Sequence, residues 1–170
     1  MSEITFEQLN LENPLLQSLQ NIQFKTPTPI QKDVIPHLKK SEDIIALAET
    51  GSGKTAAFII PLINQILKDE DRTTKEIKYI VLSPTRELAQ QTHEVCKSIG
   101  KSLDITSSLL IGGENIQKQK ESISKKPHFL IATPGRLKDL FQQKILNFKT
   151  VKGVVLDEAD RLLDMGFKDE

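Results

Sequence analysis

Five short apolar runs punctuate the sequence, and within each of them the hydrophobic residues are nearly continuous rather than alternating with polar ones. Such runs are typical of strands whose two faces are both buried, as in a parallel sheet that is covered by helices. The predicted strands span residues 44–48, 79–82, 108–111, 129–132 and 153–156.

Helical patterns fill most of the intervals between these runs, with apolar residues that recur at the 3.6-residue period of a helix face. The predicted helices span residues 30–38, 54–67, 86–99, 115–123, 134–141 and 158–163. The alternation of strands and helices indicates parallel strands joined by right-handed crossovers, and therefore an open α/β sheet. We expect residues 1–40, which carry the segment Pro27-Thr-Pro29, to form an N-terminal extension on a domain that spans residues 41–170.

Composition narrows the possible functions. The 170 residues suffice for one domain with a single sizeable core. The 23 basic and 23 acidic residues cancel, which excludes nucleic-acid binding through bulk positive charge and leaves only a local basic surface. No apolar run is long enough for a membrane span, so no membrane partner is expected. The single cysteine, Cys96, excludes an internal disulfide and a cysteine-built metal site, and it favours a reducing, cytoplasmic location.

The first run leads into Ala48-Glu-Thr-Gly-Ser-Gly-Lys-Thr55, the pattern of a phosphate-binding P-loop with alanine in place of the usual first glycine. Its glycines allow main-chain N–H groups to turn toward phosphate oxygens. Lys54 can reach the terminal phosphates, and the Thr55 hydroxyl can hold Mg²⁺. The alternative is an ordinary Gly-Ser turn between a strand and a helix. The predicted nucleotide contacts in this loop are Glu49, Thr50, Gly51, Ser52, Gly53, Lys54 and Thr55.

A second polar cluster, Asp157-Glu-Ala-Asp160, follows the last run. A carboxylate at the end of a buried strand is unfavourable unless a partner compensates it, and nucleotide-bound Mg²⁺ is the natural partner of Asp157. Glu158 would then orient or activate the attacking water. The alternative is an acidic helix N-terminus, where carboxylates favour the helix dipole. Because ligands bind at the carboxyl ends of parallel strands, we expect Lys54 and Asp157 to share one edge of the sheet.

With the P-loop and Asp157-Glu-Ala-Asp160 together, the chain resembles the DEAD-box RNA helicases from Phe6 to its end. Further motifs of that family occur in the family's order: Phe24-Lys-Thr-Pro-Thr-Pro-Ile-Gln31, Pro84-Thr-Arg-Glu-Leu88, Gly112-Gly113 and Thr133-Pro-Gly-Arg136. The resemblance implies a RecA-like P-loop NTPase fold, a three-layer α/β sandwich around a mostly parallel sheet, with ATP and Mg²⁺ as cofactors. It implies ATP hydrolysis coupled to the unwinding or remodelling of RNA duplexes, and a role for Asp160 in coupling between motifs and domains.

The resemblance also implies that Gln31 reads adenine, because its amide can donate to a ring nitrogen and accept from the exocyclic amine. It implies that Phe24 stacks on the base, and it identifies Phe6 as the family's isolated upstream aromatic residue. Gln23 stands where the family usually has glycine. From the residues alone, Gln31 is a polar residue that opens a helix.

The other motifs are implied to hold RNA, and they follow the ends of the second, third and fourth predicted strands. They suit contacts with a phosphate backbone rather than with base edges, so binding is expected to be independent of sequence and sensitive to salt. The alternatives are a helix cap at Thr133-Pro134 and structural ion pairs of the two arginines. The implied RNA contacts are Pro84, Thr85, Arg86, Gly112, Gly113, Thr133, Pro134, Gly135 and Arg136.

The family's Ser-Ala-Thr strand and its C-terminal RecA-like domain, which supplies an arginine finger, have no counterpart in these 170 residues. We therefore expect a sheet that is incomplete at its C-terminal end, weak ATP binding and hydrolysis, and no unwinding by this chain alone. In the family the Ser-Ala-Thr strand separates the P-loop strand from the Asp157 strand. We therefore expect the runs at 44–48 and 153–156 to expose unpaired backbone and apolar side chains.

Two other functions stay open at this point. One is a non-catalytic module, derived from a helicase, that binds RNA or a partner protein. The other is an unrelated P-loop NTPase, such as a kinase or a DNA-strand-exchange protein, which the Gln31 segment and the order of the acidic tetrapeptide argue against. A preference for adenine over guanine nucleotides would distinguish the helicase from the unrelated NTPase.

Overall fold

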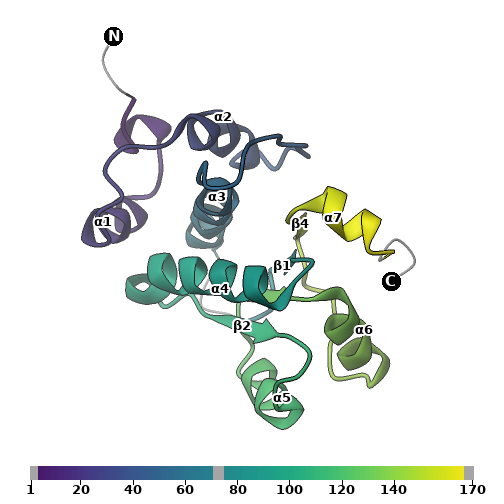
Figure 1. Ribbon diagram of the computed structural model, residues 1–170. Coiled ribbons are helices and arrows are strands. Elements are labelled where there is room, and N and C mark those ends of the chain that lie inside the picture. The colour runs from purple at the N-terminus through teal and green to yellow at the C-terminus, as the bar shows by residue number, and fades with distance from the viewer. Residues whose placement is uncertain (1–3, 71–74, 167–170) are drawn as a thin grey trace. The chain divides into compact units, whose positions relative to one another are not determined.

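The computed structural model describes residues 4–70 and 75–166. These residues fall into two compact units. Unit 1 contains the described residues of 1–73 and 95–105, and unit 2 contains those of 74–94 and 106–170. The division falls within one helix, α4 (Arg86–Gly100), which Figure 1 shows with the other elements. None of the helices in the described ranges combines the length and the apolar character that a membrane crossing requires.

The regular elements in the described residues of unit 1 are all helices. Helix α2 packs on α3, and α1 packs on η2. The sequence predicted α2 and α3 to within one residue at each end, whereas it did not predict α1. The elements are η1 (Glu7–Leu9), α1 (Asn13–Asn21), α2 (Pro29–Leu38), α3 (Lys54–Lys68), the last turns of α4, and η2 (Lys101–Leu103). The fully buried side chains of its core are Leu15, Leu19, Ile35, Ile59, Ile60, Ile63 and Ile99.

Polar contacts tie α1 to the rest of unit 1. The Ser18 hydroxyl, which is buried, donates to the Ile99 carbonyl oxygen at 2.6 Å. The Glu12 N–H, just before α1, donates to Asn64 Oδ1 on α3 at 2.7 Å. Residues 4–40 therefore pack together with the P-loop helix, while the predicted domain boundary at residue 40 stays a prediction.

Helix α1 is followed by a left-handed residue that is not glycine. Gln23 has a φ of 63°, and the next N–H, that of Phe24, donates back to the Leu19 carbonyl oxygen at 2.9 Å. Glycine is favoured at this position after a helix because an L side chain is strained there. Gln23 thus adopts a left-handed conformation that glycine would favour, with a strain of about 1 kcal/mol.

The strand predicted at 44–48 is not formed. Residues 42–49 have no regular secondary structure, and Ile45 and Leu47 are 93% and 90% exposed. A strand needs a neighbour that pairs with its N–H and C=O groups, and the strands in the described part of the chain pair only among themselves. The predicted strand was therefore wrong, whereas the expected exposure of apolar side chains in this run is confirmed.

Unit 2 is built on a four-stranded sheet with the order β2-β3-β1-β4, in which all neighbours are parallel. This confirms the predicted α/β fold with a parallel sheet. The register aligns Leu82 with Ala132 and with Leu156, so the carboxyl ends of the strands are level along one edge. The strands are β1 (Tyr79–Leu82), β2 (Ser107–Leu110), β3 (Phe129–Ala132) and β4 (Gly153–Leu156). The helices are the first turns of α4, α5 (Ile116–Ser124), α6 (Pro134–Gln142) and α7 (Ala159–Asp164).

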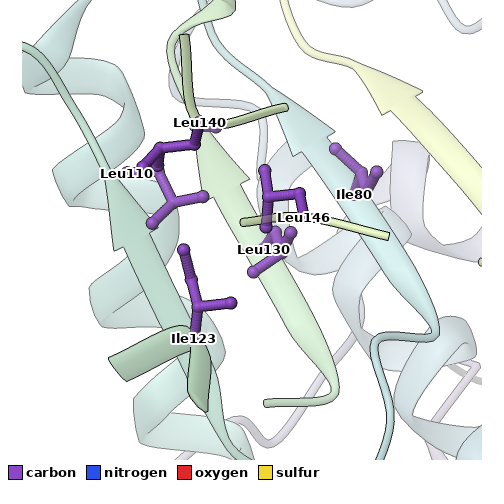
Figure 2. Packing of buried hydrophobic residues seen from close by; sticks show 7 residues of the cluster. Ile80, Leu110, Ile123, Leu130, Leu140 and Leu146 are labelled. Carbon is purple, nitrogen blue, oxygen red and sulfur yellow. The ribbon is translucent and has the colours of Figure 1, made fainter. Parts of the chain in front are cut away.

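Helices α5 and α6 pack on one face of this sheet. Figure 2 shows Ile80, Leu110 and Leu130 of the strands gathered with Ile123 of α5 and Leu140 of α6. All five side chains are buried. This core packs three neighbouring strands against two helices. The strands are therefore held in a fixed arrangement, and so are the polar motifs that follow their carboxyl ends.

Strand β4 lies at the edge of the described sheet, with β1 as its neighbour. Val154 and Leu156 are 57% and 56% exposed, and they alternate with the partly buried Gly153 and Val155. Neither a charged residue nor proline interrupts this strand. The expected exposure of apolar side chains in the run at 153–156 is therefore confirmed.

Candidate functional site

The P-loop in unit 1 has the backbone of a phosphate cradle. Gly51 and Gly53 have φ values of 83° and 92°, in the left-handed region that glycine tolerates and L side chains disfavour. Gly53 directly precedes α3, whose first N–H groups have no partners within the helix. Ser52 Oγ is buried and has no hydrogen-bond partner among the residues that the structure describes. A bound anion could satisfy both the helix N–H groups and this hydroxyl.

The side chain of Lys54 bends back over this loop. Its Nζ donates to the Ala48 carbonyl oxygen at 2.7 Å. An ammonium at a helix N-terminus is opposed by the helix dipole, so a phosphate would be a better partner for this group than a neutral carbonyl. The residues present therefore fit the phosphates of a nucleotide.

The candidate ligands of Mg²⁺ are Thr55, which is partly buried, and Asp157 of unit 2. Within residues 4–70 and 75–166, no three His, Cys, Asp or Glu side chains are grouped so that they could hold a metal ion. Mg²⁺ commonly takes one or two protein ligands and completes its shell with water and phosphate oxygens. Thr55 lies in unit 1 and Asp157 in unit 2, so their binding of one Mg²⁺ ion stays a prediction.

Gln31 joins α2 to the P-loop. Its Oε1 accepts from the Thr28 N–H at 3.0 Å, and its Nε2 donates to the Gly53 carbonyl oxygen at 3.1 Å. The side chain is buried. A Cβ at Gly53 would lie 2.6 Å from Gln31 Nε2 and 3.0 Å from Thr28 Oγ1, so only glycine fits at this contact.

The other predicted nucleotide contacts in unit 1 differ in exposure. Phe6 is 2% exposed and belongs to the core of the unit. Phe24 is partly buried, whereas Glu49 and Thr50 are exposed. Contacts of these residues with a nucleotide stay predictions.

Asp157 in unit 2 directly follows β4, at the level edge of the sheet. Its N–H donates to the Leu82 carbonyl oxygen at 2.9 Å, which continues the ladder between β1 and β4. Its Oδ2 accepts from the Thr92 hydroxyl at 3.4 Å. Thr92 lies on α4 and is 2% exposed. The carboxylate is therefore positioned by the sheet and by a helix packed beside it.

Glu158 is the residue before α7 and has a left-handed φ of 51°. Its Oε2 accepts from Arg161 Nη1 at 2.7 Å, and its side chain is 16% exposed. Asp160 is exposed on the first turn of the helix. The carboxylate predicted to act on water is thus held by an arginine three residues later.

Arg86 opens α4 after the buried Pro84. The hydroxyl of Thr85 accepts from the Leu88 N–H at 3.3 Å and so caps this helix. The exposed guanidinium of Arg86 lies against Gly113, where an added Cβ would be 2.9 Å from Arg86 Cζ. The structure therefore brings together two motifs that are separated in sequence.

The fourth predicted motif links β3 to α6. The Thr133 N–H donates to the Leu110 carbonyl oxygen at 3.0 Å, and its side chain makes no cap hydrogen bond. Pro134 is buried and Gly135 is exposed. Arg136 Nε lies 3.9 Å from Asp139 Oδ2, and the buried Arg136 Nη1 has no hydrogen-bond partner among the described residues. The unpaired N–H groups of this guanidinium favour an anion nearby.

The level register of unit 2 sets Asp157 on the same edge as the segments after β1 and β3. The acidic motif and the segments predicted to bind RNA are thus brought together, as the motif positions at strand ends indicated. Lys54 lies in unit 1, so the expected sharing of one edge by Lys54 and Asp157 stays a prediction.

Sequence reasoning missed three positioning contacts in unit 2: those of Thr92, Arg161 and Gln119. Arg161 could have been found, because residues three apart on a helix are neighbours. Thr92 fits the apolar face of α4 by spacing, and nothing in its spacing identifies a partner. Gln119 Nε2 donates to the Ile111 carbonyl oxygen at 2.9 Å, a contact between α5 and the chain after β2 that no local pattern predicts.

Known proteins have sequences similar to that of this chain. The family profile described as DEAD/DEAH box helicase matches residues 28–170. The ATP-dependent rRNA helicase RRP3 of Candida glabrata is 47% identical over 169 residues, which cover 97% of this chain and 34% of that protein. The DEAD-box ATP-dependent RNA helicase CshA of Bacillus cereus is 43% identical over 163 residues, which cover 96% of this chain and 30% of that protein. The chain thus spans about a third of the length of these curated relatives.

Solved structures show the same fold. The crystal structure of a DEAD box protein from the hyperthermophile Methanococcus jannaschii has a TM-score of 0.88 and 39% sequence identity. The match covers 99% of this chain and 45% of that one. A hypothetical ATP-dependent RNA helicase from Sulfolobus tokodaii has a TM-score of 0.84 at 31% identity, with 94% and 45% covered.

Proposed function

Since this chain belongs to the DEAD/DEAH box helicase family, we propose that it is the ATP-binding part of an ATP-dependent RNA helicase. ATP hydrolysis would be coupled to the unwinding or remodelling of RNA duplexes in a protein that also contains a second, C-terminal RecA-like domain. RNA is the substrate class that the relatives' names have in common. The 170 residues alone are expected to bind ATP weakly and not to unwind RNA.

The observation that carries this proposal is the hydrogen bond from Gln31 to the Gly53 carbonyl oxygen, 3.1 Å long. It connects the segment predicted to read adenine with the loop predicted to hold the phosphates. A nucleotide bound there would contact the Gln31 segment with its base and the P-loop with its phosphates. Because the two are joined by this hydrogen bond, the identity of the base could influence the geometry of the P-loop. A P-loop NTPase without an adenine-reading segment has no need of such a link.

Three groups of the P-loop would hold the nucleotide. The N–H groups around Gly51 and Gly53 would surround the phosphate oxygens, and Lys54 would exchange the Ala48 carbonyl for a phosphate. Thr55 and Asp157 would bind Mg²⁺, which neutralises phosphate charge and orients the terminal phosphate.

Glu158 would orient the attacking water, which requires a free oxygen on its carboxylate. In this structure one of its oxygens is bound by Arg161 at 2.7 Å. Arg161 therefore holds the carboxylate in one orientation, and the second oxygen is the one proposed to accept from water. Asp160, exposed beside this pair, is proposed to couple the motif to the second domain.

Two clusters in unit 2 would hold the RNA backbone. Arg86, with Pro84 and Thr85, forms one cluster beside Gly112 and Gly113. The segment Thr133-Pro-Gly-Arg136 forms the other, with a buried and unpaired guanidinium N–H among the described residues. Both offer N–H groups suited to phosphate oxygens, so recognition is proposed to be independent of base sequence.

The nucleotide proposal is tested by titrating the chain with fluorescent analogues of ADP and GDP in the presence of Mg²⁺. We expect ADP to bind at least about tenfold more tightly, a difference of about 1.4 kcal/mol, because guanine does not match the amide of Gln31. Equal affinity for the two nucleotides would contradict the proposed adenine site. The rate of ATP turnover, measured with and without single-stranded RNA, then tests whether hydrolysis is coupled to RNA binding.

A non-catalytic binding module is the second candidate. It is favoured by one observation, namely that Lys54 and Glu158 both have partners within the chain, the Ala48 carbonyl oxygen and Arg161. Such a module would bind RNA and nucleotide with no turnover above that of the Glu158→Gln variant. For either candidate we propose a reducing, cytoplasmic setting, which the presence of only one cysteine in the sequence, the buried Cys96, supports.

A further inference from the structure

The guanidinium of Arg86 is seated on the backbone of two glycines in unit 2. At Gly113 an added Cβ would overlap Arg86 Nη1 and would be 2.9 Å from Cζ, closer than real Cβ atoms approach other groups. At Gly112 an added Cβ would be 3.6 Å from Arg86 Nη2, an ordinary van der Waals distance. Of the two glycines, therefore, only Gly113 must lack a side chain for the Arg86 guanidinium to keep its position.

Among the residues that the structure describes, no polar partner holds Arg86 in place. It forms no hydrogen bond or ion pair with another residue in the described ranges, although Glu87 and Glu114 adjoin the two motifs in sequence. An exposed arginine without a partner normally samples many rotamers. Packing against a bare peptide restricts this sampling and leaves all five guanidinium N–H groups available.

The turn Ile111-Gly112-Gly113, against which the Arg86 guanidinium lies and which is called the seat below, is held in place by α5. Gln119 Nε2 donates to the carbonyl oxygen of Ile111, the residue before Gly112, at 2.9 Å. Gln119 is 6% exposed, so this bond is protected from water. The turn that carries the two glycines is thus tied to α5, and the Arg86 guanidinium lies against Gly113 of this turn.

We propose that Gly113 is a positioning residue that acts through Arg86, and that Gln119 fixes the turn on which it depends. Gly113 presents the Arg86 guanidinium to an RNA phosphate because it has no side chain to displace that group. The guanidinium can then bind the phosphate through two parallel N–H bonds. This inference rests on the proposed RNA-binding function, and it assigns Gly113 a role other than direct contact with RNA.

A double-mutant cycle tests this inference, with the binding of a short fluorescent oligouridine RNA as the readout. The variants are Gly113→Ala, Arg86→Ala and their combination. Gly166→Ala is the matched control, because Gly166 has a φ of 78° and an added Cβ there would meet no atom of the described residues within 4 Å. We expect each of the first two to weaken binding by about tenfold, the effect of losing one charge-assisted contact. Each should also reduce the salt dependence of binding by about one phosphate contact.

The combination decides the mechanism. If Gly113 acts through Arg86, then Gly113→Ala has no further effect on affinity once Arg86 is alanine, and Gly166→Ala stays within about twofold of the parent chain. A Gly113→Ala effect of the same size in both backgrounds overturns the inference. Alanine at position 113 would also strain the backbone, because Gly113 has a φ of 79°. This strain would lower the melting temperature equally whether residue 86 is arginine or alanine, so the melting temperature distinguishes it from the displacement of Arg86.

A readout without RNA separates failure of this inference from failure of the proposed function. The Nε–Hε signal of Arg86 in ¹H–¹⁵N NMR spectra reports the order of its side chain. Gly113→Ala and Gln119→Ala should increase the mobility of this group, whereas Gly166→Ala should not. An unchanged Arg86 signal in Gly113→Ala overturns the seat even if RNA binds. Absence of salt-dependent RNA binding by the parent chain, with the seat intact in NMR, overturns the RNA role of the seat and contradicts RNA binding by this chain.

Discussion

Gln31 on α2 donates through Nε2 to the carbonyl oxygen of Gly53, the last residue of the P-loop before α3, at 3.1 Å. The same side chain accepts from the Thr28 N–H at 3.0 Å, so both ends of its amide have partners. Because these partners lie within unit 1, the arrangement does not require a bound nucleotide. The amide links a proposed base-reading segment to a proposed phosphate cradle.

Gln31→Glu tests this link by keeping an acceptor toward Thr28 and removing the donor toward Gly53. We expect it to lower the free energy of unfolding by about 1–3 kcal/mol, because it places a carboxylate against the Gly53 carbonyl oxygen with no donor between them, although that oxygen still accepts from the Ala57 N–H at 3.1 Å. ADP binding should weaken in parallel. Urea denaturation and ADP titration measure the two effects. Gln17→Glu, an exposed position on α1, is the matched control, and identical behaviour of the two variants would refute the link.

Lys54→Ala should reduce nucleotide affinity by about tenfold to a hundredfold, since a charge-assisted hydrogen bond contributes about 1.5–3 kcal/mol. The fold should persist, because in the structure Lys54 Nζ contacts only the nearby Ala48 carbonyl oxygen among the residues described. Binding of fluorescent ADP measures this. Lys68→Ala, at the other end of α3, removes the same charge from an exposed position and should leave affinity unchanged. Equal losses in the two variants would show that general charge, rather than Lys54, attracts the phosphates.

Glu158→Gln should keep ADP affinity and lower ATP turnover by about a hundredfold or more, the usual effect of removing a general base. Glutamine keeps an oxygen that can accept from Arg161, so α7 should stay folded. Phosphate release in the presence of single-stranded RNA is the measurement. Asp164→Asn, at the exposed end of the same helix, serves as the control. Turnover retained in Glu158→Gln would exclude this carboxylate as the group that acts on water.

Gln23→Gly should raise the free energy of unfolding by up to about 1 kcal/mol, because glycine relieves the left-handed strain at a φ of 63°. The opposite sign is expected for Gln17→Gly, at an exposed position in the middle of α1, where glycine is less favourable than alanine by about 0.5–1 kcal/mol. Thermal denaturation of the two variants checks both signs. A loss of stability in Gln23→Gly would show that the Gln23 side chain stabilises the fold by more than the left-handed strain destabilises it.

Val154→Lys should reduce self-association of the chain at high concentration, because a charge on an unpaired edge strand opposes pairing with another edge. Val154 is 57% exposed, so the melting temperature should change little. Sedimentation velocity over a range of concentrations provides the measurement. Leu163→Lys, at 61% exposure on α7, adds the same charge away from the edge. If both substitutions suppress association equally, net charge and not the edge is responsible.

Much of the secondary structure was determined by the sequence itself. The helix at 54–68 follows from an apolar stripe with a period of 3.6 residues, and α6 follows from a proline at its first position. Strands β1, β3 and β4 were predicted with the bounds observed. These features depend on residues that are close in the chain, so local patterns suffice to predict them. The positions of the motifs at strand ends then followed from the parallel topology.

Tertiary structure decided the rest, because pairing between distant segments has no local signal. Residues 44–48 have the composition of a strand, but without a paired neighbour they remain irregular and exposed. The contacts of Gln31 with Gly53 and of Arg86 with Gly113 join residues more than twenty positions apart, and each depends on a side chain fitting where a glycine has none. The sequence determined which residues carry the chemistry of this protein, and the packing of the folded chain determined which of them meet.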